Sequence, residues 1–179
     1  MPRGLQRFHH SGHLHFITFS CYHRRPLLAV PEAMNRFVAA LEAARQDFGW
    51  RIFGYVVMPE HVHLLVDEPE RGSLADAIHS LKLSLSKQKS CTKALTSDGD
   101  RLWQTRYYDR NIFTSTEFVE KIRYIHRNPV KRGLCEKPEE WLWSSFRYYA
   151  LKEPGVVEIA SEWTLKVRDD RVPTSKQKR

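Results

Sequence analysis

Apolar residues along the first half of the chain alternate between strand-like and helix-like spacing. Residues 13–22 combine aromatic and β-branched side chains, which favours a strand. Apolar residues at helical spacing follow Pro31 and stop before Gly49, which predicts a helix between them. Residues 50–57, and the segment that follows them to about residue 67, predict two strands of an antiparallel hairpin.

The next segments complete an order of elements that is typical of one fold. Ser73 is a suitable N-cap for a helix whose apolar residues recur as far as Leu85. An extended stretch, residues 103–113, follows it. The order strand, helix, strand, strand, helix, strand is that of the ferredoxin-like βαββαβ fold. We therefore predict an α+β protein with helices packed on an antiparallel sheet, whose first and third strands are central.

A polar tail is expected to follow this single domain. A chain of 179 residues suits one hydrophobic core, which we place in residues 1–160. Basic and polar residues dominate from about Thr164 onward, so residues 161–179 are predicted to be a flexible basic tail.

The charge and the cysteines narrow the class of protein. The 29 Lys and Arg residues exceed the 21 Asp and Glu residues, which favours a nucleic-acid partner over a merely solubilising charge. The three cysteines have no paired spacing, which excludes a disulfide framework and favours the reducing cytoplasm. No segment has the apolar character of a signal peptide or the length of a membrane span.

Two histidines follow the turn Met58-Pro59-Glu60. His61 and His63 are two residues apart on a predicted strand, so their side chains project from one face with Cα atoms about 7 Å apart. The apolar residues after them place the pair on a buried strand. Two imidazoles on one face can converge on a single cation.

A further helix is predicted between Thr114 and Pro129. Thr114 and Glu117 have the spacing of a capping box. Tyr124 lies about 150° from the centre of the apolar stripe of this helix, so it does not anchor the helix in the core. Asn128 is one turn further on the same face. Because it precedes a proline, Asn128 is expected to be the last, half-helical residue.

These motifs together resemble a known family. The sequence Met-Pro-Glu-His-Val-His at 58–63, then Tyr-x-x-x-Asn-Pro-Val-Lys-x-Gly at 124–133 and Trp-x-Trp-Ser-Ser at 141–145, is similar to that of the HUH single-tyrosine transposases. Within them it most resembles the REP-associated tyrosine transposases of bacteria. The resemblance covers roughly residues 10–150, and the order and spacing of the motifs make it far more specific than a bare His-x-His.

The resemblance implies an enzyme that nicks and rejoins DNA. Tyr124 would be the nucleophile, and His61, His63 and Asn128 would hold a divalent metal, Mg²⁺ or Mn²⁺. Many relatives have glutamine at the position of Asn128. The expected product is a 5′-phosphotyrosine bond and a free 3′-OH, and rejoining needs no ATP.

The implied substrate is single-stranded DNA with a hairpin, of the short palindromic kind known as REP, in the bacterial nucleoid. A monomer is favoured over a homodimer. The basic residues proposed to contact DNA are Lys82, Lys87, Lys89, Arg106, Arg110, Arg132 and Arg147.

Alternatives remain open. His13 and His15 form a second His-x-His on the strand next to that of His61, and four histidines would suit zinc. We favour instead one core-facing histidine and one with a local hydrogen bond. A ferredoxin-like sheet can also be a non-catalytic nucleic-acid-binding module, although the sequence lacks the aromatic strand motif of RNA-recognition domains. A host enzyme with the same chemistry has the same sequence features.

Overall fold

Four strands and four α-helices make up the part of the chain that the computed structural model describes, residues 12–87 and 101–161. The strands are β1 (Leu14–Ser20), β2 (Ile52–Val57), β3 (His61–Val66) and β4 (Tyr108–Ile112). The α-helices are α1 (Pro31–Phe48), α2 (Leu74–Lys87), α3 (Ser115–Lys131) and α4 (Phe146–Leu151), and short 3₁₀ helices span Tyr22–Arg24 and Pro138–Glu140.

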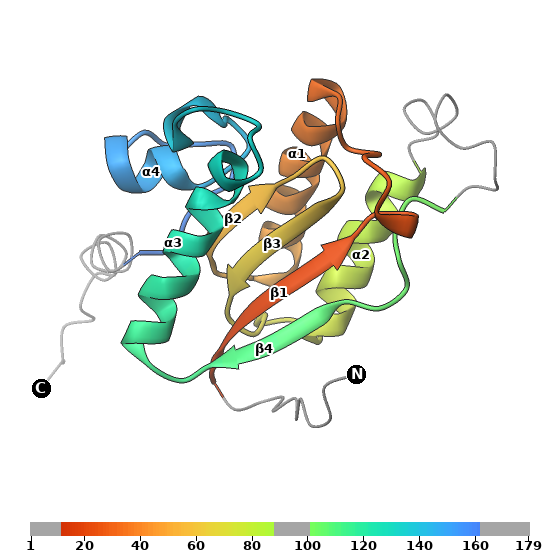
Figure 1. Ribbon diagram of the computed structural model, residues 1–179. Coiled ribbons are helices and arrows are strands. Elements are labelled where there is room, and N and C mark those ends of the chain that lie inside the picture. Colours follow the sequence, from red (N-terminus) through yellow and green to blue (C-terminus); the bar gives the residue numbers. More distant parts are fainter. Residues whose placement is uncertain (1–11, 88–100, 162–179) are drawn as a thin grey trace, which may run out of the picture.

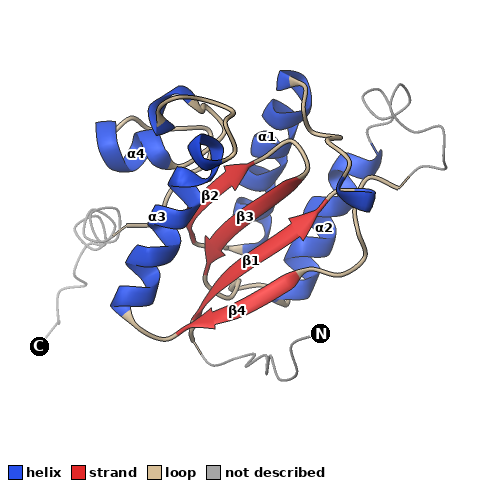
Figure 2. Ribbon diagram, viewed as in Figure 1, coloured by secondary structure: helices blue, strands red, loops and turns tan. Residues whose placement is uncertain are grey.

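The strands form one antiparallel sheet in the order β2-β3-β1-β4. Helices α1 and α2 lie side by side on one face, and α3 crosses the other face over β2 and β3 (Figure 1; the strands are red in Figure 2). This arrangement confirms the predicted ferredoxin-like α+β fold, with β1 and β3 in the middle of the sheet and α3 as an added helix.

The two faces of the sheet have different roles. In the pairing of β1 with β3, Thr18 lies opposite His63, so both side chains project from the face that α3 covers. Phe19 projects from the opposite face, where its ring packs against Phe37 of α1 with centroids 6.0 Å apart. We refer to these as the α3 face and the α1–α2 face.

Helix α3 approaches β2 closely because residue 54 is glycine. A Cβ atom at Gly54 would lie only 2.6 Å from Cδ1 of Ile122, well inside van der Waals contact. Ile122 and Ile125 are buried in this interface, as the apolar stripe predicted. The glycine therefore sets how near the tyrosine-bearing helix lies to the sheet.

The expected end of α3 at Pro129 is wrong. Thr114 caps the helix as predicted, its hydroxyl accepting the N–H of Glu117 at 3.1 Å, but the helix continues to Lys131. Proline lacks the N–H that would bond the preceding turn, yet the backbone N–H of Arg132 still donates to the carbonyl of Asn128 at 3.0 Å. Burial of Asn128 and Pro129 against the fold outweighs the local bias before proline.

The chain after α3 closes the outer edge of β2. Trp141 is buried against the core, and its indole N–H donates to the carbonyl of Val57 at 2.9 Å. Trp143 is half-buried. Backbone hydrogen bonds along this edge run from Val57 to Trp143 (2.9 Å), from Ser145 to Tyr55 (3.0 Å) and from Ala160 to Ile52 (2.8 Å).

Candidate active site

The side chains of His61 and His63 meet at the start of β3. Both are buried, each 4% exposed, and both lie on the α3 face of the sheet. Their Nε2 atoms are 3.0 Å apart. The period-two spacing of the sequence therefore brings the two imidazoles together as predicted.

The other nitrogen of each ring is held by a neighbour. Nδ1 of His61 donates to the carboxylate of Glu60 at 3.1 Å, and Nδ1 of His63 shares a hydrogen bond with the hydroxyl of Thr18 at 2.7 Å. These contacts turn both Nε2 atoms toward the same space. A histidine that ligates a metal through Nε2 characteristically has its Nδ1 held in this way.

Burial keeps this pair neutral. It lowers the pKa of His63 to about 3, and the charges of His61, Lys121 and Arg24 act in the same direction. Burial also lowers the pKa of His61, although Glu60 opposes that shift. At neutral pH both rings are uncharged, which is the state that a metal ligand requires.

Tyr124 lies directly beside this pair. Its ring stands edge-on to that of His63, with centroids 5.1 Å apart and the planes at 72°, and edge-on to Phe16 at 5.9 Å. Tyr124 is 41% exposed, as its position off the apolar stripe predicted. The phenol thus lies between the buried histidines and the solvent.

Neighbouring turns of α3 place further polar groups on the same side. Asn128, one turn after Tyr124, is buried. One turn before it, Nζ of Lys121 lies 4.9 Å from the ring centroid of Phe16 and 6.0 Å from that of Tyr124. Arg132 forms an ion pair with Glu60. The α3 face of the sheet therefore carries two imidazoles, and helix α3 brings a phenol and an ammonium group over the same part of that face.

The four-histidine alternative is wrong. His15 is fully buried on the α1–α2 face, where its Nδ1 bonds the carboxylate of Asp109 on β4 at 2.9 Å. The register of β1 against β3 puts His15 opposite Val66 and away from His61. His13 packs edge-on against Phe113, with centroids 4.8 Å apart. One histidine of the second pair is therefore core-facing, as favoured above.

The described residues offer no cluster of three or more His, Cys, Asp and Glu side chains able to hold a metal ion. The donors that face the common space are two imidazole nitrogens, and Asn128 is a buried residue of the adjacent helix, one turn after Tyr124. Two converging Nε2 atoms with supported Nδ1 atoms fit a divalent cation in a site that keeps open positions.

The proposed DNA contacts lie on different parts of the molecule. Arg110 is on β4, on the α3 face, paired with Glu117 at 2.9 Å. Lys82 lies instead near Phe19 of the α1–α2 face and donates to the carbonyl of Gln104 at 2.7 Å, and burial lowers its pKa. The remaining candidates on this part of the chain are Arg106, exposed before β4, and Lys87, the last residue of α2, while Lys89 lies outside the described residues.

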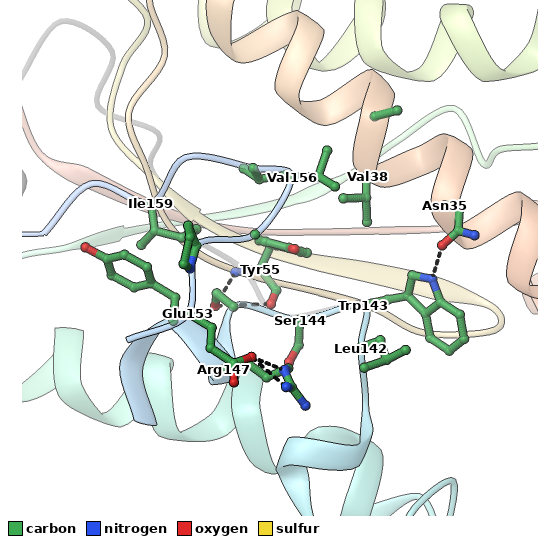
Figure 3. Close-up of a pocket in the computed structure, with 16 residues that line it drawn as sticks. Asn35, Val38, Tyr55, Leu142, Trp143, Ser144, Arg147, Glu153, Val156 and Ile159 are labelled. Atoms are coloured by element: carbon green, nitrogen blue, oxygen red, sulfur yellow. Dashed lines mark hydrogen bonds and ion pairs between the residues drawn. The ribbon is translucent and has the colours of Figure 1, made fainter. Parts of the chain in front are cut away.

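Arg147 lines a cavity that is separate from the histidines. The cavity has a volume of about 330 Å³ and lies between α1, the outer edge of β2 and the segment around α4 (Figure 3). Arg147 donates to Glu153 at 2.8 Å in its wall, and the indole of Trp143 donates to Asn35 at 2.8 Å. None of the four predicted site residues lines it.

Thr18 and Glu60 were missed as parts of the site in the sequence. Glu60 had a signal, because a carboxylate next to a presumed ligand histidine can hold its ring. Thr18 had none, because only the register of β1 against β3 places it beside His63.

Comparison with known proteins gives the class of this chain. Residues 8–128 match the family model described as "Transposase IS200 like", and the chain belongs to that family. No helix among the described residues is long and apolar enough to span a membrane.

Within that class the chain resembles the REP-associated tyrosine transposases, as its motifs indicated. A Haemophilus influenzae protein assigned to that group is 27% identical over 167 residues, covering 89% of this chain and 94% of the relative. The REP-associated tyrosine transposase of Escherichia coli K12 is 28% identical over 142 residues, covering 79% and 81%. The solved structure of a REP-associated tyrosine transposase bound to a REP hairpin shares the fold, with a TM-score of 0.66 at 23% identity, covering 89% and 93%.

Proposed function

We propose that this chain is a metal-dependent endonuclease and strand transferase that acts on hairpin-forming single-stranded DNA through a 5′-phosphotyrosine intermediate. The observation that carries the proposal is the contact of Tyr124 with His63, whose Nε2 faces that of His61. The names of the relatives, and the REP hairpin bound in the related structure, support the choice of DNA substrate. The net charge of +8 suits it.

His61 and His63 would hold Mg²⁺ or Mn²⁺ through Nε2, with the Asn128 amide as a third donor. When bound, the cation supplies positive charge that offsets the negative charge of the phosphate oxygens. These residues carry no negative charge of their own, because the histidines are neutral and the third donor is an amide. The full charge of the cation is therefore available to the phosphate.

Tyr124 would attack the scissile phosphorus. Its phenolic oxygen forms a bond to phosphorus while the bond from phosphorus to the 3′-oxygen breaks, and the phenolic proton passes to water. The 3′-oxygen leaves and is protonated. One phosphodiester replaces another, so a 3′-OH can reverse the step and rejoin a strand without ATP.

All parts of this site come from one chain. Helix α3 packs onto β2 and β3 of the same molecule, which supports an active monomer. Sedimentation equilibrium of the active protein, with and without hairpin DNA, tests this. A dimer as the only active species would contradict it.

The decisive experiment is Tyr124→Phe with a labelled hairpin oligonucleotide and Mn²⁺. The wild-type chain is expected to form a covalent protein–DNA adduct that survives denaturation, and the variant is expected to bind the hairpin without forming one. If the wild-type chain binds but forms no adduct with any hairpin, the non-catalytic binding module is the correct interpretation.

A further inference from the structure

Tyr124 is one contact between α3 and the strand of the histidines. Two turns further on, at the C-cap of α3, Arg132 reaches Glu60, the residue just before His61. The two segments therefore run in opposite directions: Tyr124 contacts His63, and the later residue Arg132 contacts the earlier residue Glu60. Two contacts fix the helix along the strand better than one.

The carboxylate of Glu60 is shared. Its Oε1 atom accepts from the guanidinium of Arg132 and from Nδ1 of His61, the latter at 3.1 Å. The Glu60 side chain is only 11% exposed, whereas that of Arg132 is 50% exposed. The backbone around the carboxylate is also held, because the carbonyl of Glu60 accepts the N–H of Cys21 at 2.9 Å. A nearly buried carboxylate with two donors has little freedom to turn away.

We propose that Glu60 and Arg132 are positioning residues that make the orientation of His61 depend on the docking of the tyrosine helix. Accepting Nδ1–H fixes the tautomer of His61 and leaves its lone pair on Nε2, toward His63. Arg132 holds the carboxylate in the place where it can do this. The inference rests on the proposed function, because it assigns these two residues a role toward the proposed cation.

This role differs from the one that the sequence suggested for Arg132. A DNA contact would contribute to hairpin affinity whether or not a cation is present, and would increase the dependence of that affinity on salt. A positioning residue would instead change cation affinity in the absence of DNA. Loss of Arg132 should therefore lower hairpin affinity measured without the cation if it is a DNA contact, and Mn²⁺ affinity measured without DNA if it is a positioning residue.

The test uses the full chain with Glu60→Gln, Arg132→Met, the double variant and Arg127→Met. Arg127 is an exposed arginine on the same helix, so its variant controls for loss of one positive charge from α3. Mn²⁺ affinity without DNA is measured from the electron paramagnetic resonance of free Mn²⁺, and hairpin affinity is measured in EDTA. Thermal melting checks that each variant is folded, and Arg132→Lys replaces Arg132→Met if the latter is not.

Glu60→Gln and Arg132→Met are each expected to weaken Mn²⁺ binding about 10-fold, the usual effect of losing such a supporting contact. The double variant should bind Mn²⁺ no more weakly than whichever single variant has the lower affinity, because Glu60 and Arg132 act through one carboxylate. Arg127→Met should bind Mn²⁺ like the wild type. Hairpin affinity of Glu60→Gln in EDTA should stay within about twofold of wild type, since Glu60 is not offered as a DNA contact.

The inference is overturned if Arg132→Met binds Mn²⁺ like the wild type but loses hairpin affinity, because Arg132 is then a DNA contact. Unchanged Mn²⁺ affinity in Glu60→Gln overturns it as well. A wild-type chain that binds no Mn²⁺ removes both this role and the metal dependence of the proposed function. If every variant binds Mn²⁺ like the wild type, and the wild type forms the adduct, the positioning role is rejected and the proposed function is not.

Discussion

The rings of Tyr124 and His63 touch edge to face although their accessibility is very different. His63 is 4% exposed and Tyr124 is 41% exposed, with ring centroids 5.1 Å apart. The contact thus joins a shielded imidazole to a phenol that a large substrate can reach. A nucleophile for DNA has to lie against such shielded groups and still be accessible to its substrate.

Removal of the Thr18 hydroxyl should weaken cation binding without unfolding the sheet. A threonine hydroxyl can either donate to Nδ1 of His63 or accept from it, so it supports both neutral tautomers of that ring. Thr18→Val is expected to need about 10-fold more Mn²⁺ for half-maximal adduct formation. Thr18→Ser retains the hydroxyl and serves as the matched control. Equal Mn²⁺ requirements for the two variants would remove Thr18 from the site.

Lys121 is expected to accelerate adduct formation. Its ammonium group lies 6.0 Å from the ring centroid of Tyr124, on the turn of α3 before it. Positive charge fixed beside a reacting phosphate stabilises the charge that develops during attack. Lys121→Gln should slow adduct formation at saturating hairpin and Mn²⁺ by about 10-fold, and Lys121→Arg should slow it less.

The control for that prediction is Arg123→Gln, which removes a charge from an exposed position on the same helix. Single-turnover rates separate the step from binding. A rate for Lys121→Gln equal to that of Arg123→Gln would mean that Lys121 supplies only general attraction for DNA.

A side chain at residue 54 should move the tyrosine helix away from the sheet. The Cβ atom of Gly54→Ala would meet Cδ1 of Ile122 at 2.6 Å, so the isoleucine or the helix has to shift. The expected loss is about 1–3 kcal/mol in the free energy of unfolding, measured with urea. In an Ile122→Val background, which lacks that methyl group, the same change should cost less.

Gly155→Ala is the matched control, because a Cβ atom at Gly155 meets nothing within 4 Å. If it destabilises the chain as much as Gly54→Ala, the close approach of α3 is not the cause.

Stability should fall as the pH decreases from about 6.5 to 4, in part because of His126. Burial lowers the pKa of His126 to about 4, and its Nε2 bonds the hydroxyl of Ser145 at 2.9 Å. The unfolded chain therefore takes up this proton first, and the stabilisation present above pH 6.5 is lost toward pH 4. The difference between the pKa of His126 in the folded and in the unfolded chain corresponds to about 3 kcal/mol in the free energy of unfolding.

His126→Gln cannot titrate, so it should narrow the difference in the free energy of unfolding between pH 7 and pH 4.5. Urea titrations at the two pH values measure it. A difference as large as in the wild type would assign the acid sensitivity to other groups, among them His61 and His63, whose pKa values burial lowers too.

Local sequence rules were sufficient for the four strands, for α1 and α2 and for the start of α3, but not for the end of α3 or for α4. Period-two spacing placed His61 and His63 on one face, and helical periodicity placed Tyr124 off the apolar stripe. The same spacing rule could not distinguish that pair from His13 and His15, because the face each strand presents depends on the register between strands.

Contacts between distant segments account for what the sequence did not predict. Thr18 meets His63 only through strand pairing, and Arg132 meets Glu60 only through helix docking. The rule for residues before proline failed at Asn128 for a related reason. It describes a local preference, and here burial of the helix end against the sheet is stronger.

The closure of the outer edge of β2 by the chain's own C-terminal segment limits how two copies could assemble. The backbone groups of Tyr55, Val57 and Ile52 that a foreign strand would need are already bonded within the molecule. A continuous sheet joined through β2 would require that segment to peel away. Because Ser145 in that segment also bonds His126 of α3, such an assembly would loosen the helix that carries Tyr124. Assembly through this edge and a correctly placed tyrosine are therefore in competition.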